Sequence, residues 1–155
     1  ELPSLAKREN WIALHPGSGS ETKNWPEHNW RDLLSHLLDH SPLNLLLIGG
    51  EAEGGKLQRL ARRLSGDRIE IAQHIPLSEL APRLANCSGY VGHDTGLTHL
   101  ASALGLPTLV LWGPSNEAVW RPLGENVRVL NQHGTLAYLT LETVVEAINA
   151  LELRC

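Results

Sequence analysis

The sequence predicts an α/β protein with an open, parallel, Rossmann-like sheet and helices on both faces. Three observations favour this class. Apolar strands alternate with amphipathic helices from Trp11 to the end of the chain. Some strands are apolar almost throughout, as from Leu43 to Ile48, where Asn44 is the one polar residue, and this is typical of parallel strands covered on both sides. Polar residues gather directly after the strands, where open α/β sheets bind ligands.

The composition indicates one globular domain and argues against several kinds of partner. The chain has 155 residues, 42% of them hydrophobic, which is enough for one core. A net charge of −4 and the lack of a Lys/Arg run give no support to nucleic-acid binding. No apolar run is long enough to span a membrane, and the start has no secretory signal pattern. Cys87 and Cys155 make no disulfide framework, so we expect a reduced, cytoplasmic setting.

The beginning of the chain is predicted to lie outside the domain. Residues 1–10 are polar and are expected to be a linker or tail, with the domain at 11–155. The sequence contains no methionine, so we expect that Glu1 is not a natural start and that the chain is a piece of something longer.

The first strand is predicted from Trp11 to His15, followed by a loop from Pro16 to Asn24 that is rich in glycine and hydroxyl groups. Such a loop can wrap amides and hydroxyls around a phosphate, and Lys23 adds positive charge. Loops of this composition are also common as plain connections. Pro26 suits the first turn of the next helix, which should continue to about His40 with an apolar face.

Two acidic residues follow the second predicted strand, Leu43 to Ile48. Glu51 and Glu53 lie in the segment Gly49 to Glu53. A carboxylate just beyond a strand can accept hydrogen bonds from ribose hydroxyls. The two residues could equally serve only to favour the amino end of the next helix.

A helix, a strand and a second helix are expected next. The first helix has its apolar face from Leu57 to Leu64 and ends at Gly66, and the strand runs from Ile69 to Ala72. Ser78 can cap the second helix, which should reach Asn86. Pro82 would then fall within the first turn, where it removes no helical bond. Its inward-facing residues are expected to be Leu77, Leu80 and Leu84.

The segment from Gly89 to Pro107 organises the rest of the chain. It indicates a short strand at Tyr90 and Val91, a tight turn, and a helix closed by Gly105. The apolar residues of this helix recur at helical period. They are Leu97, Leu100, Ala101 and Leu104.

The helix is expected to open at Asp94, Thr95 and Gly96, and its first amides form a candidate anion site. Asp94 or Thr95 can cap it, and Gly96 allows a ligand close to the backbone. His99 would lie beside Thr95, one turn along. Capping alone would also explain these residue types.

The prediction is completed by a strand from Thr108 to Trp112, a turn at Gly113 to Asn116, a strand from Val127 to Leu130 and a helix from Leu141 to Leu151. Loops after four of the strands should meet at one edge of the sheet, which favours a nucleotide-type site. The polar segments concerned are 18–23, 51–53, 93–99 and 113–116.

Other kinds of site find no support. His93 and His99 are six residues apart, without metal-ligand spacing, so the eight histidines are interpreted as scattered surface residues. No Gly-x-Ser-x-Gly elbow occurs, which argues against a hydrolase triad. The five tryptophans are assigned mainly to the core, and Trp25, beside Lys23, is the one considered as a ligand wall.

Several motifs together resemble glycosyltransferase family 9, the lipopolysaccharide heptosyltransferases that use ADP-heptose. The resemblance extends from Trp11 to about Leu130. It implies a GT-B fold, in which two Rossmann-like domains face a cleft, and it matches the carboxyl-terminal, donor-binding half. The motifs are His15-Pro16-Gly17-Ser18, Lys23-Asn24-Trp25-Pro26 with Trp30, Gly49-Gly50-Glu51-Ala52-Glu53, Asp94-Thr95-Gly96-Leu97-Thr98-His99-Leu100-Ala101 and Gly113-Pro114.

The resemblance implies roles for individual residues at the donor phosphates. Thr95, Gly96 and His99 would hold the pyrophosphate. Lys23 would bridge phosphate and sugar, and Ser18 would contact phosphate.

Further roles concern the rest of the donor. The resemblance implies that Asp94 holds hydroxyls of the transferred sugar, and that Glu53, in preference to Glu51, holds the ribose. Leu77 is a possible wall for the base. The family's general base is an Asp of the amino-terminal domain, so no catalytic residue is expected in this chain, which alone should be inactive.

The implied partners are a nucleoside diphosphate sugar, with ADP-heptose favoured, and a lipopolysaccharide-core acceptor held by the amino-terminal domain. No metal is expected, because a helix amino end, Lys23 and His99 can stabilise the leaving pyrophosphate. We expect a cytoplasmic location, with a peripheral position at the inner face of the bacterial inner membrane as a further expectation. The alternatives are a GT-B-like sugar-nucleotide epimerase and a non-catalytic nucleotide-binding domain.

Overall fold

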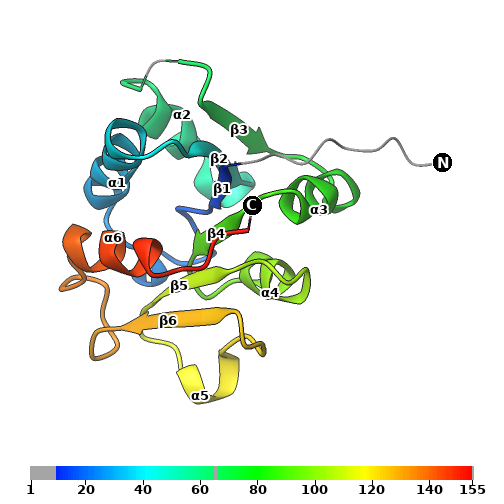
Figure 1. Cartoon of the computed structure of the whole chain (residues 1–155). Coiled ribbons are helices and arrows are strands. Elements are labelled where there is room, and N and C mark those ends of the chain that lie inside the picture. Colours follow the sequence, from blue (N-terminus) through cyan, green and yellow to red (C-terminus); the bar gives the residue numbers. More distant parts are fainter. Residues whose placement is uncertain (1–9, 65, 155) are drawn as a thin grey trace.

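A computed structural model describes residues 10–64 and 66–154, and its centre is one parallel sheet (Figure 1). The strands are β1 (Trp11–Leu14), β2 (Asn44–Gly49), β3 (Ile69–Gln73), β4 (Gly89–Gly92), β5 (Thr108–Trp112) and β6 (Val127–Asn131). They lie side by side in the order β3-β2-β1-β4-β5-β6, and every neighbouring pair is parallel. The chain therefore grows outward in both directions from the β1–β4 boundary, and open sheets bind ligands at such a switch point.

Helices cover both faces of this sheet, as Figure 1 shows. The helices are α1 (Glu27–His40), α2 (Lys56–Ala61), α3 (Leu77–Ala85), α4 (Gly96–Ala103), α5 (Glu117–Trp120) and α6 (Leu141–Asn149), with short 3-10 turns η1 (Glu21–Lys23) and η2 (Glu51–Glu53). Helices α1, α2 and α6 share one apolar cluster with the sheet, and α3 and α4 share another on the opposite face. The predicted fold class is confirmed.

The burial of β2 explains the apolar run from Leu45 to Ile48. Leu45 and Leu47 belong to the cluster under α1, α2 and α6, while Leu46 and Ile48 belong to the cluster under α3 and α4. Successive side chains of a strand point to opposite faces. Each residue from Leu45 to Ile48 is therefore at most 2% exposed.

The predicted start of α3 is wrong. The helix begins at Leu77, two amides of its first turn donate to the carbonyl of Pro76, and Ser78 is already inside the helix without capping it. Pro82 therefore lies inside the helix and not in its first turn, so the helix lacks the bond that an amide at this position would make. Leu77 was expected to face inward, but 62% of its surface is exposed.

Helix α5 was not predicted. It is only one turn long, and it follows directly on the turn expected at Gly113 to Asn116. Asn116 caps this one-turn helix by accepting a hydrogen bond from the amide of Ala118 at 3.1 Å. The tail predicted at residues 1–10 falls outside the described residues except for Asn10, and Cys155 also lies outside them. In the described part of the chain, every helix is too short or too polar to cross a membrane.

Candidate functional site

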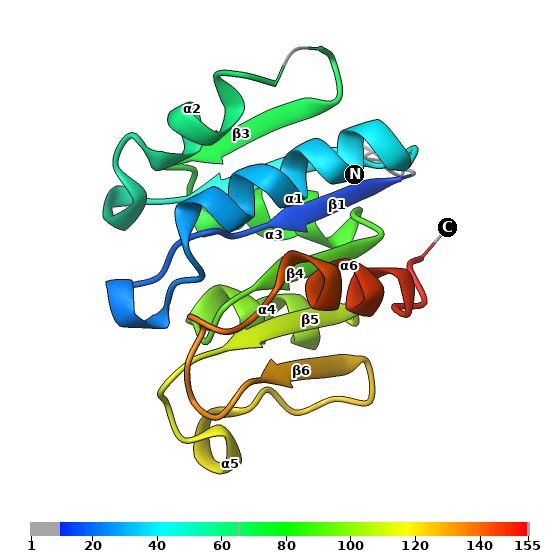
Figure 2. The ribbon, with the colours of Figure 1, turned by 90° about the vertical axis from the view of Figure 1, so that its left-hand side faces the viewer.

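The carboxyl ends of the six parallel strands point to one edge of the sheet, where the loops gather (Figure 2). The loop after β1 touches the loops after β4 and β5 there. His93, directly after β4, lies within 3.2 Å of the carbonyl of Gly17. A side-chain carbon added to Gly113, after β5, would lie 3.4 Å from the carbonyl of Thr22. The predicted convergence of these segments is therefore present.

One ion pair joins the two loops that flank the switch point. Nζ of Lys23, at the end of η1, lies 3.3 Å from Oδ2 of Asp94, which follows β4. The Lys23 side chain is 37% exposed and the Asp94 side chain 11% exposed. A half-exposed pair of this kind adds little stability, but it places a cation and a hydrogen-bond acceptor side by side at the surface.

Helix α4 opens beside this pair. Thr95 is its N-cap, and its hydroxyl accepts a hydrogen bond from the amide of Thr98 at 3.4 Å, so the capping prediction is confirmed. Gly96 is exposed, and a side-chain carbon there would meet open space. The backbone at Gly96 is therefore accessible to an anion, which the helix dipole favours at this end. His99 lies one turn further on and is also exposed.

A buried hydroxyl network fixes the turn before α4. Thr98 donates from Oγ1 to the carbonyl of His93 at 2.5 Å and lies 3.0 Å from the hydroxyl of Tyr90. Burial raises the pKa of the Tyr90 phenol, so it stays neutral. Gly92 is required here, because a side-chain carbon would collide with the Tyr90 ring. These contacts hold Asp94 and Thr95 at the end of β4.

His93 is a core residue, which corrects its interpretation as a surface histidine. It is 0% exposed, and its Nε2 accepts a hydrogen bond from the amide of Trp25 at 2.9 Å. Its Nδ1 therefore carries the proton and donates to the carbonyl of Gly17. Burial lowers the pKa of His93 to about 3, so the ring is neutral at physiological pH. His93 thus ties the loop after β1 to the end of β4.

Glu53 is held in a second buried contact. Its carboxylate lies 3.1 Å from Nε2 of His15 and accepts the amide of Gly50 at 2.5 Å. The hydrogen bond from His15 outweighs burial, and the Gly50 amide adds to it, so that the pKa of Glu53 falls to about 2. Glu53 is 8% exposed and lies where a side chain on Gly17 would be. Glu51, by contrast, is exposed.

A pocket of about 440 Å³ borders Glu53 on the side of α2. Lys56, at the start of α2, is only 7% exposed and lines it. Asn24 also lines it, and its buried Oδ1 finds no hydrogen-bond partner among the described residues. Of the predicted donor-binding residues, Glu53 lines this pocket, whereas Lys23 and the start of α4 lie outside its lining.

Of two other predicted donor-binding residues, Ser18 is buried and Leu77 is exposed. Ser18 is 8% exposed, and its hydroxyl donates to the carbonyl of Ser20 at 2.7 Å, so it closes its own turn. Leu77, the possible wall for the base, is exposed at the start of α3, after β3.

Trp25 is among the residues that line the pocket beside Glu53, but its ring belongs to the core. The side chain is 0% exposed, and its indole N–H donates to the carbonyl of Leu139 at 2.9 Å. Trp30 and Trp112 are also fully buried, as expected of core tryptophans, but Trp120 on α5 is 58% exposed.

Sequence reasoning missed His15 and His93 as supports of the site. His15 was part of a quoted motif, yet its partner is 38 residues away in the sequence. No local pattern identifies such a contact.

Comparison with known proteins gives a consistent result. The family described as "Glycosyltransferase family 9 (heptosyltransferase)" matches residues 2–145. A lipopolysaccharide heptosyltransferase 1 of Pseudomonas aeruginosa is 38% identical over 105 residues, which cover 68% of this chain and 29% of that protein. The heptosyltransferase WaaC of E. coli with ADP superposes with a TM-score of 0.84 at 27% identity, covering 93% of this chain and 45% of that one.

A second structure of WaaC, with ADP-2-deoxy-2-fluoro heptose, has a TM-score of 0.79 at 30% identity and covers 90% of this chain and 42% of that one. The chain described above thus spans less than half the length of each of these proteins.

Proposed function

Because the chain belongs to glycosyltransferase family 9, we propose that it is the donor-binding half of a GT-B enzyme. This enzyme transfers a heptose-type sugar from a nucleoside diphosphate sugar to a lipopolysaccharide-core acceptor. ADP-heptose is the proposed donor, since the similar WaaC structures contain ADP and an ADP-heptose analogue.

One structural observation carries the proposal. The Lys23–Asp94 pair lies at the β1–β4 switch point, next to the accessible start of α4. The helix amino end and Lys23 supply positive potential, and Asp94 supplies an acceptor for hydroxyl groups. A nucleoside diphosphate sugar needs both, because it joins a doubly charged pyrophosphate to a ring of hydroxyls.

The proposed contacts follow from this placement. Thr95, Gly96 and His99 hold the pyrophosphate at the start of α4. Lys23 bridges phosphate and sugar, and Asp94 holds the sugar hydroxyls. As the bond from sugar to phosphate breaks, negative charge grows on the leaving pyrophosphate. The fixed amides and Lys23 stabilise this charge most in the transition state, which lowers the barrier.

The remaining contacts concern the nucleoside and the outer phosphate. We propose that Glu53 accepts a ribose hydroxyl, with His15 keeping its carboxylate ionised and oriented. Ser18 contacts phosphate from the loop after β1, after its hydroxyl leaves its own turn. Leu77 is the proposed wall for the base.

The acceptor's base is proposed to lie in a facing amino-terminal domain, because the matched proteins are more than twice as long as the region they share with this chain. A nearby base is needed to take the proton of the attacking hydroxyl. The cytoplasmic location, the peripheral position at the inner membrane and the independence from metal remain predictions.

Transfer is tested with the protein at its full natural length, supplied with ADP-heptose and a heptose-free lipopolysaccharide core. Appearance of a heptosylated core together with ADP supports the proposal. Recovery of an isomerised sugar nucleotide would instead favour an epimerase. Binding of ADP-heptose without any turnover would favour a non-catalytic nucleotide-binding domain.

A further inference from the structure

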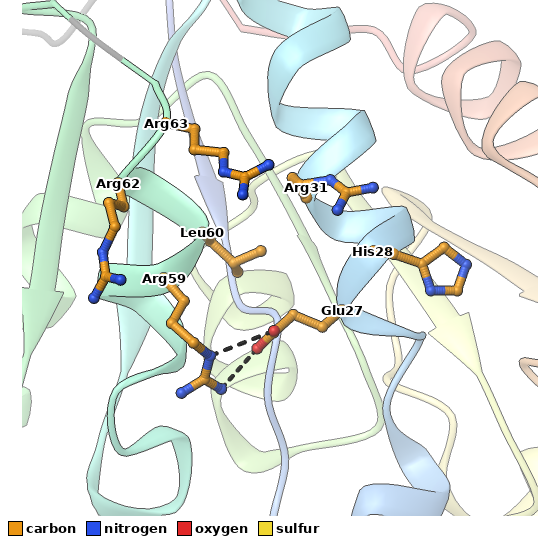
Figure 3. Close-up of a pocket in the computed structure, with 7 residues that line it drawn as sticks. All are labelled: Glu27, His28, Arg31, Arg59, Leu60, Arg62 and Arg63. Carbon is orange, nitrogen blue, oxygen red and sulfur yellow. Dashed lines mark hydrogen bonds and ion pairs between the residues drawn. The ribbon is translucent and has the colours of Figure 1, made fainter.

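A second charged site lies between α1 and α2, next to the pocket that borders Glu53, with which it shares Glu27 and Arg59. A pocket of about 290 Å³ is lined there by four arginines and one histidine, together with a single carboxylate and a leucine (Figure 3). These four are among the ten arginines of a chain whose net charge is −4. The lining residues are Glu27, His28, Arg31, Arg59, Leu60, Arg62 and Arg63.

The carboxylate of this pocket, on Glu27, already pairs with an arginine of the same pocket. Glu27 on α1 accepts two hydrogen bonds from Arg59 on α2, at 2.8 and 3.4 Å, as the dashed lines of Figure 3 show. The Arg59 guanidinium lowers the pKa of the Glu27 carboxyl, which therefore stays ionised and paired. Glu27 thus closes one end of the groove, and its charge is used by Arg59.

The remaining guanidinium groups keep donors available. Arg31 pairs with its sequence neighbour Asp32 at 3.0 Å, and this pair uses only some of the N–H donors of the Arg31 guanidinium. Arg63 is exposed and extends from α2 toward α1 in Figure 3, and no partner is recorded for it within the described chain. A guanidinium has five N–H donors, so Arg31 and Arg63 can both bind a further group from opposite sides of the groove.

Local structure explains only part of this charge. Basic residues after the last turn of α2, such as Arg62 and Arg63, interact favourably with the helix dipole. Arg59, in the last turn of α2, shares this reason, but it does not apply to Arg31 on the facing helix. Arg31 and Arg63 bring positive charge to the groove from α1 and from the turn after α2, and an anion between them would offset it.

We propose that the groove between α1 and α2 binds a phosphate-bearing anion, at a site distinct from the proposed pyrophosphate site at the start of α4. A phosphate presents several oxygens to planar guanidinium forks, which bind it in pairs of parallel hydrogen bonds. Leu60, 2% exposed, gives the groove an apolar floor, which strengthens charged contacts above it. The group could belong to a dissolved phosphomonoester or to a lipid headgroup, since both present the same oxygens.

The test uses the 155-residue chain and inorganic phosphate as the probe. Phosphate is titrated while the Nε–Hε signals of the arginines are followed by NMR. The signals of Arg31, Arg59 and Arg63 should move together and saturate. Arg63→Gln should weaken this binding about tenfold, as loss of a charged hydrogen bond predicts. Arg83→Gln on α3, across the sheet, is the matched control and should leave it unchanged.

Vesicles identify the source of the phosphate. Co-sedimentation with equimolar phosphatidylcholine and phosphatidylglycerol, lost in Arg63→Gln and absent with phosphatidylcholine alone, would assign the groove to a lipid headgroup. Saturation by dissolved phosphate without vesicle binding would assign it to a soluble phosphomonoester. The proposal is wrong if phosphate moves only the signals of residues near Asp94 to His99. It is also wrong if Arg63→Gln, like the control Arg83→Gln, binds phosphate as tightly as the unchanged chain does. Neither result would contradict the proposed role of the donor site.

Discussion

The backbone amide of Trp25 donates a hydrogen bond of 2.9 Å to Nε2 of His93, a residue 68 positions further along the chain. This bond joins the loop after β1 to the end of β4, the two sides of the switch point. The bond requires a neutral ring, because a protonated Nε2 could no longer accept.

The first prediction follows from the low pKa of His93. In the unfolded chain this histidine takes up a proton near pH 6.5, whereas burial keeps it neutral in the fold down to a pKa of about 3. Stability is therefore full above pH 6.5 and falls as the pH drops toward 3. One such group costs about 2 kcal/mol of stability between pH 7 and pH 5.

This pH dependence is measured by urea unfolding of the chain and of His93→Asn at several pH values. The variant should be less stable at pH 7 but should lose less stability on acidification. His133→Asn is the control for an ordinary histidine, since that residue is not buried. Equal slopes for the chain and His93→Asn would show that His93 is not held neutral by the fold.

The second prediction concerns Lys23. Lys23→Ala removes the cation beside α4 and leaves Asp94 without its partner, so a pyrophosphate would meet an uncompensated carboxylate. We expect ADP affinity to fall by about 2 kcal/mol, the size of one charged hydrogen bond. His99→Ala should weaken binding less, because it leaves the Lys23–Asp94 pair intact. Isothermal titration calorimetry with ADP measures both.

Two controls accompany this experiment. Asp94→Asn should not weaken binding of ADP, because its proposed contact is to the sugar, which ADP lacks. Arg128→Ala, on the edge strand β6, removes an exposed cation elsewhere and should have no effect. Unchanged affinity in both Lys23→Ala and His99→Ala would remove these residues from the site.

The third prediction separates the two acidic residues after β2. Glu53→Gln should lower ADP affinity and also the free energy of unfolding, because His15 and Gly50 donate to different carboxylate oxygens and glutamine offers only one acceptor oxygen. Since the pKa of Glu53 is depressed to about 2, the stability it adds is present above pH 4.5 and is lost as the pH falls toward 2. Glu51→Gln, at an exposed position, should change neither quantity. The reverse pattern of affinities would assign the ribose contact to Glu51.

The fourth prediction is that ADP binding needs no divalent cation. The start of α4 and Lys23 already offer positive groups to the pyrophosphate. Titrations in a chelator and in magnesium should give equal affinities. Binding that disappears in the chelator and returns with magnesium or manganese would contradict this prediction.

The sequence predicts those parts of the fold that depend on local periodicity. The strand β2 and the helix α4 follow directly from apolar patterns and from the capping residues Thr95 and Gly105, the latter at φ +77°. The start of α3 was missed because Ser78 is a good cap by type, while the chain is already helical from Leu77, after Pro76. A local rule cannot decide between two neighbouring positions that both permit a helix start.

The candidate site likewise has a part that local sequence predicts and a part that it does not. Asp94, Thr95 and Gly96 were identified because the turn between a strand and a helix brings them together within a few residues. The contacts of His93 to Trp25 and of His15 to Glu53 are determined by the packing order of β2, β1 and β4. Their partners lie far apart in the sequence, so periodicity and motif spacing contain no information about them.

The most direct test of the account is an ADP titration of the 155-residue chain followed by NMR. We expect saturable binding with a dissociation constant of about 1 mM or tighter, corresponding to roughly −4 kcal/mol. The largest shifts should fall on residues 18–23 and 94–99, and Lys23→Ala should abolish most of them. No saturable binding at millimolar ADP, or shifts confined to other parts of the sheet, would contradict the assignment of this chain as a donor-binding domain.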